Sequence, residues 1–169
     1  MDTQKQQSTI NTLYGMLIIS TILSFTPFMP MLLLSVALFL SVLVGAYIYR
    51  AKDQKDGLLY NHMTYMIGTI WIGTGLITLG TMLAAYWIYT KGDPGALQNA
   101  IDSMGSGGMI DETYLEAALT GYMADNKGLL IKASIITIGP GILYFVYRVA
   151  NGFSRSLKGY RIANPKSWL

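Results

Sequence analysis

The sequence predicts an all-α fold: a polytopic membrane protein with four transmembrane helices and a short helical extracytoplasmic loop. Of its 169 residues, 52% are hydrophobic and only 12% are charged, about half the charged share of soluble domains. The apolar residues gather in four runs, each about as long as a helix that crosses a bilayer. Basic residues collect at the ends of these runs, which is the usual signal of membrane topology.

The four runs are expected to form one membrane domain, residues 1–169. The first run is the weakest, because polar residues such as Asn11 and Thr12 dilute it, and the second is the clearest. The third is long enough to tilt in the bilayer. Pro27 and Pro30 mark a tight turn between the first two runs, which predicts a helical hairpin there. The predicted spans are residues 10–26, 30–49, 63–89 and 129–150.

The basic residues predict that both chain ends lie in the cytoplasm. Four spans place nine Lys and Arg residues on the side of the chain ends and three on the other side. Lys and Arg are in excess on the cytoplasmic side, so residues 151–169 are expected to be a cytoplasmic tail. Because the basic residues lie at the ends of the spans, they indicate membrane topology, and we predict no nucleic-acid partner. The nine are Lys5, Arg50, Lys52, Lys55, Arg148, Arg155, Lys158, Arg161 and Lys166; the three are Lys91, Lys127 and Lys132.

Residues 90–128 form the predicted outer loop, which reads as two short helices. The first is expected over residues 96–104, and a glycine-rich break follows it. Thr113 and Glu116 have the spacing of a capping box for the second helix, which would end near residue 125. Its apolar residues share one face, which would rest on the membrane or on the protein's own helix ends, or would bind a partner. They are Leu115, Leu119 and Tyr122.

No catalytic or metal-binding residue is predicted. The chain has no cysteine and one histidine, His62, which excludes a disulfide framework and argues against a protein-only zinc site. A local hydrogen bond at the membrane surface is favoured for His62 over a role as ligand or proton relay. No Asp, Glu or Arg is expected at mid-depth, since Arg148 is expected at the inner end of its span. We therefore expect no enzyme activity and no cofactor, and we expect bound lipid.

Small residues predict close helix packing. Such residues let helix backbones approach closely in lipid, and a Gly-Pro-Gly sequence in the last span predicts a kink, because proline removes one helical hydrogen bond. The predicted packing residues are Ala37, Ser41 and Gly45 in the second span, Gly68, Gly73, Gly75 and Gly80 in the third, and Gly139, Pro140 and Gly141 in the fourth.

Short motifs in the C-terminal two thirds of the chain resemble a known family. They are residues 59–62, which lead into a helix with Trp71, residues 144–149 at the end of the last helix, and the tail segments 152–159 and 164–169. Together they resemble uncharacterised small bacterial inner-membrane proteins grouped with the Tic20-like superfamily, over about Leu58 to Leu169. The resemblance implies a bacterial inner membrane and, from some relatives, an accessory or assembly role.

Two functions remain open. The first is a non-enzymatic accessory subunit or assembly factor of a larger inner-membrane complex, with membrane lipids and other membrane subunits as partners. The second is a small homo-oligomeric transporter or channel that uses the Gly/Thr face of the third span and the Gly-Pro-Gly break. The tail residues expected to contact lipid or a partner are Arg155, Lys158, Arg161 and Lys166.

Overall fold

The fold, taken from a computed structural model, contains helices and no strands over the part of the chain it describes, residues 3–55, 57–105 and 112–168. This confirms the predicted all-α class. The helices are α1 (Thr3–Ser24), α2 (Met29–Lys52), α3 (Leu58–Lys91), α4 (Gly95–Gly105), α5 (Glu112–Asp125), α6 (Lys127–Ala133), the π-helical turn η1 (Ser134–Ile138) and α7 (Gly139–Leu157).

Three helical segments are long and apolar enough to cross a membrane: α2, α3 and the continuous run Lys127–Leu157 formed by α6, η1 and α7. The first predicted span also forms a helix, α1, but its polar first third keeps it outside this group. All four helical segments begin before the predicted spans, and the last one ends at Leu157, well past the predicted residue 150. Hydropathy misses such extensions because polar helix ends do not resemble lipid-facing sequence.

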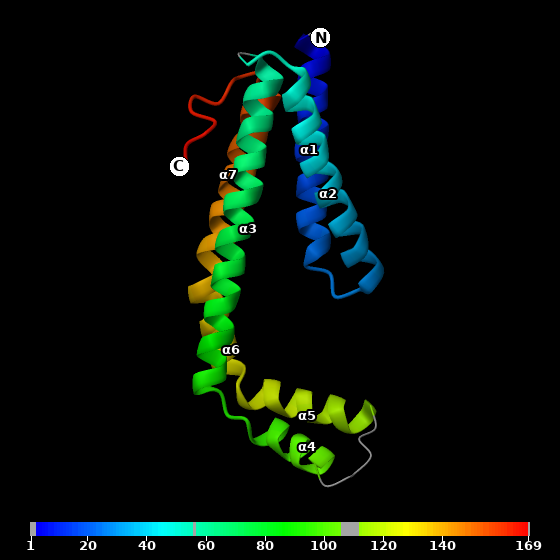
Figure 1. The fold of residues 1–169 in the computed structure, drawn as a ribbon, viewed down its shortest axis with the longest axis vertical. Helices are drawn as coiled ribbons and strands as arrows, with labels where there is room; N and C mark the ends of the chain where they lie inside the picture. The colour runs from blue at the N-terminus through cyan, green and yellow to red at the C-terminus, as the bar shows by residue number, and fades with distance from the viewer. Residues whose placement is uncertain (1–2, 56, 106–111, 169) are drawn as a thin grey trace. The chain divides into compact units, whose positions relative to one another are not determined.

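The chain divides into two compact units, Met1–Gly75 with Leu143–Leu169, and Leu76–Ile142. In the first unit, α1 and α2 form the predicted hairpin (Figure 1). Its two helices are linked by reciprocal hydrogen bonds, in which Ser20 Oγ donates to the carbonyl of Ser35 at 2.9 Å and Ser35 Oγ donates to the carbonyl of Ser20 at 2.8 Å. Neither helix leaves a buried hydroxyl unpaired at this contact, which suits a pair in an apolar medium.

The core of the first unit joins both hairpin helices to α3 and α7. Its buried side chains are Ile10, Leu13, Tyr14, Leu17, Val42, Ala46, Leu59, Met63, Met66, Ile67, Ile70, Phe145 and Val149. The α2–α3 turn and the beginning of the tail lie at the same end of this unit as the beginning of α1 (Figure 1). Gln7 Nε2 there donates to the carbonyls of Ser156 and Leu157, both at 3.0 Å. The first helix thus caps the carbonyl end of the last one.

Glycines bring two backbones together in the second unit. A side chain at Gly80 of α3 would overlap the backbone of Thr137 in η1, and one at Gly141 of α7 would press on the backbone of Ile77 in α3. The π-helical turn lies directly before the predicted kink at Pro140. Pro140 has no N–H and its ring crowds the carbonyl four residues earlier, so the widened turn accommodates it.

The segment between α3 and α6 folds as two helices, α4 and α5, close to the predicted boundaries. Asn126 joins its two ends: its Oδ1 accepts from the Asp93 N–H at 2.7 Å, and its Nδ2 donates to the Asp93 carbonyl at 2.9 Å. The expected capping box is wrong, because α5 begins at Glu112 and Thr113 therefore lies inside its first turn. The predicted glycine-rich break lies largely outside the described residues.

Candidate functional site

A buried arginine is the most unusual side chain in the first unit. Arg148 is 1% exposed and lies inside α7, nine residues before its end at Leu157. α7 continues past the predicted end of the span at residue 150, so Arg148 lies within the helix and not at its end. Ionisable groups within apolar helices are costly and usually have a defined role.

The contacts of Arg148 come from α3 and from the tail. Its Cζ stacks 3.9 Å from the centre of the Tyr65 ring, and its Nε donates to Thr69 Oγ1 at 3.0 Å. Its Nη1 donates to the backbone carbonyl of Ser167. A desolvated guanidinium gains on the order of 2 kcal/mol from an aromatic face, so Tyr65 offsets part of the cost of burial.

No carboxylate pairs with Arg148 among the residues that the structure describes. Its Nη2 makes no hydrogen bond there, and neither does the buried hydroxyl of Tyr144, which lies one turn earlier in α7. Among the described residues, its charge is therefore balanced by dipoles and by the rings of Tyr65 and Tyr144, whose centres lie 3.9 and 5.6 Å from its Cζ. Such an arrangement holds the carbonyl of Ser167 strongly, because hydrogen bonds from charged donors are the strong ones.

The tail is held to the helices at several points. α7 ends in a Schellman motif: Gly159 has φ 68°, the Tyr160 N–H donates to the Arg155 carbonyl at 2.9 Å and the Gly159 N–H donates to the Ser156 carbonyl at 3.0 Å. Beyond it, the Ile162 side chain is buried. This turn sends the tail back toward α3.

His62 is one of the residues that hold the tail. It is fully buried, and its Nε2 lies 2.9 Å from the Tyr160 carbonyl. Because a carbonyl only accepts, Nε2 carries the proton, and Nδ1 is left to accept from the Tyr14 hydroxyl at 3.4 Å. Both ring nitrogens therefore form hydrogen bonds, one with Tyr14 and one with Tyr160. Its partners are distant in sequence, and neighbouring residues therefore gave no signal of them.

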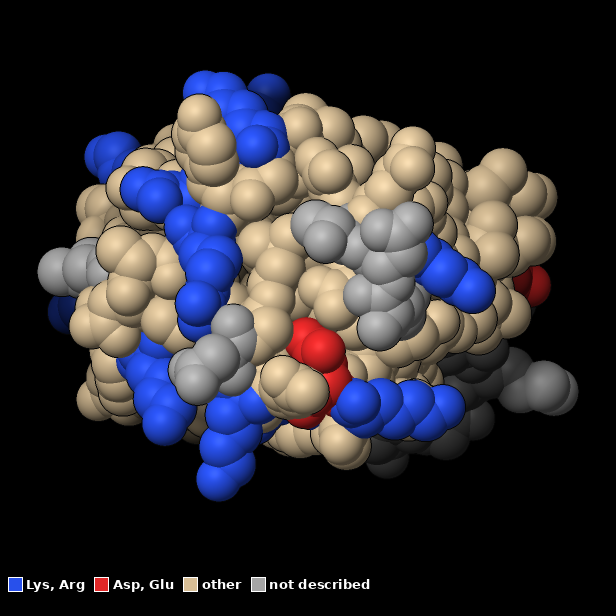
Figure 2. Space-filling view, turned by 90° about the horizontal axis from the view of Figure 1, so that it is seen from above, with Lys and Arg blue, Asp and Glu red and all other residues tan. Residues whose placement is uncertain are grey.

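The predicted tail residues lie at the basic end of the first unit. Lys158 and Arg161 are exposed, as is Lys166, while Arg155 is partly covered. The Arg155 side chain donates to Asn151 Oδ1 and to the Arg161 carbonyl. Figure 2 looks onto this end and shows Lys and Arg side chains spread over it with little acidic surface between them. The structure thus brings these residues together on one surface.

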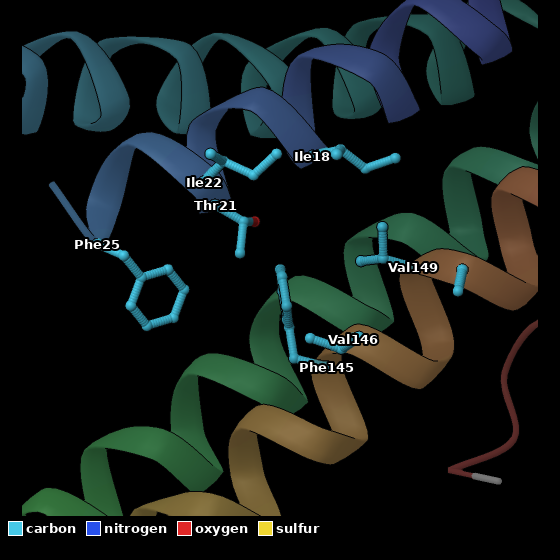
Figure 3. Close-up of a pocket in the computed structure, with 8 residues that line it drawn as sticks. Ile18, Thr21, Ile22, Phe25, Phe145, Val146 and Val149 are labelled. Carbon is cyan, nitrogen blue, oxygen red and sulfur yellow. The ribbon is translucent and has the colours of Figure 1, made fainter.

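An apolar cavity of about 390 Å³ lies between α1 and α7 in the first unit. Figure 3 shows side chains from the two helices facing each other across it. Its one polar side chain, Thr21, already donates to the carbonyl of Leu17 at 2.8 Å. The lining residues are Ile18, Thr21, Ile22, Phe25, Phe145, Val146, Val149 and Ala150.

The predicted packing residues fall into two groups. Gly45 contacts Leu13, Gly73 lies against Phe145, and Gly80 and Gly141 make the backbone contacts described above. The others lie away from close contacts: a side chain at Gly68, Gly75 or Gly139 would meet nothing within 4 Å, and Ala37, Ser41 and Pro140 are exposed.

The predicted stripe on α5 is largely uncovered. Leu115 and Leu119 are 45% and 47% exposed, and Tyr122 is partly buried. The contact of α5 with α4 passes through Gly121, which faces Ala96. The stripe is therefore not the face that packs against α4.

No group of His, Asp and Glu residues that could hold a metal ion occurs within residues 3–55, 57–105 and 112–168. Comparisons with family models, with curated proteins and with solved structures gave no match. The resemblance drawn from the short motifs stays a prediction.

Proposed function

We propose that the chain is a non-enzymatic accessory subunit or assembly factor of a larger complex in a bacterial inner membrane. The observation that carries the proposal is the small-residue face of α2, where Ala37 and Ser41 are exposed. In lipid, apolar side chains alone give helices no reason to associate, and small residues permit the close packing that does. Gly45 of the same face packs against Leu13 of α1, whereas the exposed Ala37 and Ser41 suit contact with a helix of another subunit.

The membrane arrangement is part of the proposal. The chain would cross the bilayer four times, with α1 as the additional span, and would keep both ends in the cytoplasm. The reciprocal serine bonds between α1 and α2 support this, because they satisfy polar groups inside the hairpin. The basic end of the first unit would then face the cytoplasm, as the positive-inside rule requires.

Single cysteines can test this topology, because the chain has no cysteine of its own. Ser8→Cys, Gln54→Cys and Ser154→Cys should react with a membrane-impermeant maleimide only after the membrane is opened. Thr120→Cys should react in intact cells. Labelling of Ser8→Cys from outside would exclude four spans with the N-terminus inside.

The function itself is tested by extracting the protein from its native membrane in a mild detergent. The expected result is a fixed set of other membrane subunits, which the double substitution Ala37→Leu with Ser41→Leu releases. The matched control is Ala85→Leu with Thr81→Leu, at exposed small residues of α3. Recovery of the wild-type protein as a monomer without partners would contradict the proposal.

A second candidate is a small homo-oligomeric transporter or channel. The π-helical turn Ser134–Ile138 before Pro140 favours it, because such turns occur often at functional sites. Recovery of a discrete homo-oligomer, with solute flux in liposomes that Gly75→Leu abolishes without loss of assembly, would replace the first proposal with this one.

A further inference from the structure

A basic pocket of about 520 Å³ lies at the end of the first unit, between the tail, the α2–α3 turn and the first turn of α3. Three cations line it: Lys55 from the turn, and Arg161 and Lys166 from the tail. No Asp or Glu is among its lining residues, which are Lys55, Tyr60, Asn61, Arg161, Ile162, Ala163, Asn164, Pro165 and Lys166.

The carboxylate of Asp53, two residues before Lys55, already has a hydrogen-bond partner. Asp53 belongs to a neighbouring pocket, and its Oδ2 accepts from the backbone N–H of Tyr60 at 3.0 Å. The Asp53 carboxylate thus caps the amino end of α3, where the helix dipole favours an anion. The three cations of the pocket therefore select a negatively charged ligand by their own charge.

The wall of the pocket is held in place before any ligand binds. Asn61 Nδ2 donates to the Ile162 carbonyl at 2.9 Å, and Asn61 Oδ1 accepts from the Ile162 N–H at 2.8 Å. Ile162 directly follows Arg161 and is 6% exposed. A fixed backbone lowers the entropy lost when side chains close on a ligand, so the pocket is more than a group of mobile surface charges.

The position of the pocket points to a membrane lipid. It lies where α3 begins, and the tail that forms one of its walls carries two aromatics, Tyr160 and Trp168, which are 63% and 69% exposed. Exposed Trp and Tyr at the ends of apolar helices mark the headgroup level of a bilayer, and basic pockets at that level bind phosphate-bearing headgroups.

We propose that Lys55, Arg161 and Lys166 form a specific site for the phosphate of an anionic phospholipid headgroup. The site does not depend on the proposed accessory role; it requires only that this end of the first unit meets the membrane surface. Free phosphate and soluble phosphate esters share the same chemistry, and the experiment separates them from the lipid.

The test uses the full chain in a mild detergent, with binding of water-soluble phosphatidylglycerol, phosphatidylcholine and inorganic phosphate measured by native mass spectrometry. The variant K55Q/R161Q/K166Q is compared with K91Q/K127Q/K132Q, which removes the same number of exposed charges at positions predicted to lie on the other side. One basic residue near an anionic lipid contributes roughly fivefold in affinity.

We expect the wild type to prefer phosphatidylglycerol over phosphatidylcholine, and the first variant to lose at least about tenfold of that affinity, while the control keeps it. Equal loss in both variants, or no preference between the two lipids, would overturn the site. Displacement of phosphatidylglycerol by an equal concentration of inorganic phosphate would overturn the lipid as ligand and assign the pocket to a soluble phosphate ester.

Discussion

The amide of Asn61 pairs with both backbone groups of Ile162, a residue 101 positions later in the chain. A side-chain amide that satisfies one N–H and one C=O of the same residue replaces the pairing that a neighbouring strand would give. The pair therefore fixes the position of the tail, and the burial of Ile162 depends on it.

Asn61→Leu should release the tail, because it removes both hydrogen bonds and leaves the two backbone groups of Ile162 unpaired. The expected cost is roughly 1–3 kcal/mol for opening of the tail. Limited trypsin digestion should then cut at Lys158 or Arg161 about ten times faster than in the wild type, as the open population rises. Asn164→Ala, at an exposed tail position, serves as control and should leave the rate unchanged. Equal rates in all three proteins would mean that Asn61 does not hold the tail.

Arg148→Lys should lower the thermal midpoint although it conserves the charge. The guanidinium contacts Thr69, Ser167 and the Tyr65 face at once, and a lysine ammonium, which is a compact point charge, does not reproduce that geometry. We expect a loss of roughly 1–3 kcal/mol in the free energy of unfolding, measured in detergent. Arg155→Lys is the control, since the Arg155 side chain makes only long hydrogen bonds of 3.3 and 3.4 Å. A wild-type midpoint for Arg148→Lys would show that only the charge matters.

Gly80→Ala should destabilise the second unit, because the new methyl group would overlap the backbone of Thr137. Overpacking of this kind costs roughly 1–3 kcal/mol. Gly75→Ala is a matched control on the same helix, where nothing lies within 4 Å; it should be neutral or slightly stabilising, because alanine favours a helix over glycine. Thermal unfolding of the two variants compares them, and the prediction fails if they shift the midpoint equally.

Ser20→Ala and Ser35→Ala should each destabilise the α1–α2 hairpin by about 0.6 kcal/mol, the average for a hydrogen bond between membrane helices. Each substitution removes one hydroxyl donor, while the backbone carbonyl that accepts from the other serine stays in place. The two losses should therefore add in the double variant, apart from the 3.5 Å contact between the two hydroxyl oxygens. Thr12→Ala, whose hydroxyl bonds within its own helix, gives the baseline, and a wild-type unfolding midpoint for both serine variants would contradict the prediction.

Hydropathy and turn residues predicted the helices well, because an apolar run or a turn proline can be recognised from neighbouring residues alone. The pair Pro27 and Pro30 indicated the α1–α2 turn, and Pro30 indeed lies in the first turn of α2. The interior position of Arg148 was missed, because an amphipathic continuation of α7 resembles a cytoplasmic tail in a hydropathy profile. The contacts of His62 and Asn61 depend on Tyr160 and Ile162, about a hundred residues away. No local pattern encodes such pairs, so the folded-back tail came only from the structure.

The hydrogen bonds from Gln7 to Ser156 and Leu157 join helices at opposite ends of the sequence, 149 and 150 positions apart. During synthesis, Gln7 in the polar first third of α1 therefore lacks these acceptors until Ser156 and Leu157 have been made. The same holds for Asn11, whose Oδ1 accepts from Ser156 Oγ at 2.6 Å. The polar groups of α1 thus lack these hydrogen bonds until α7 has been made. A chain that stops before residue 156 would expose them to the quality-control machinery of the cell.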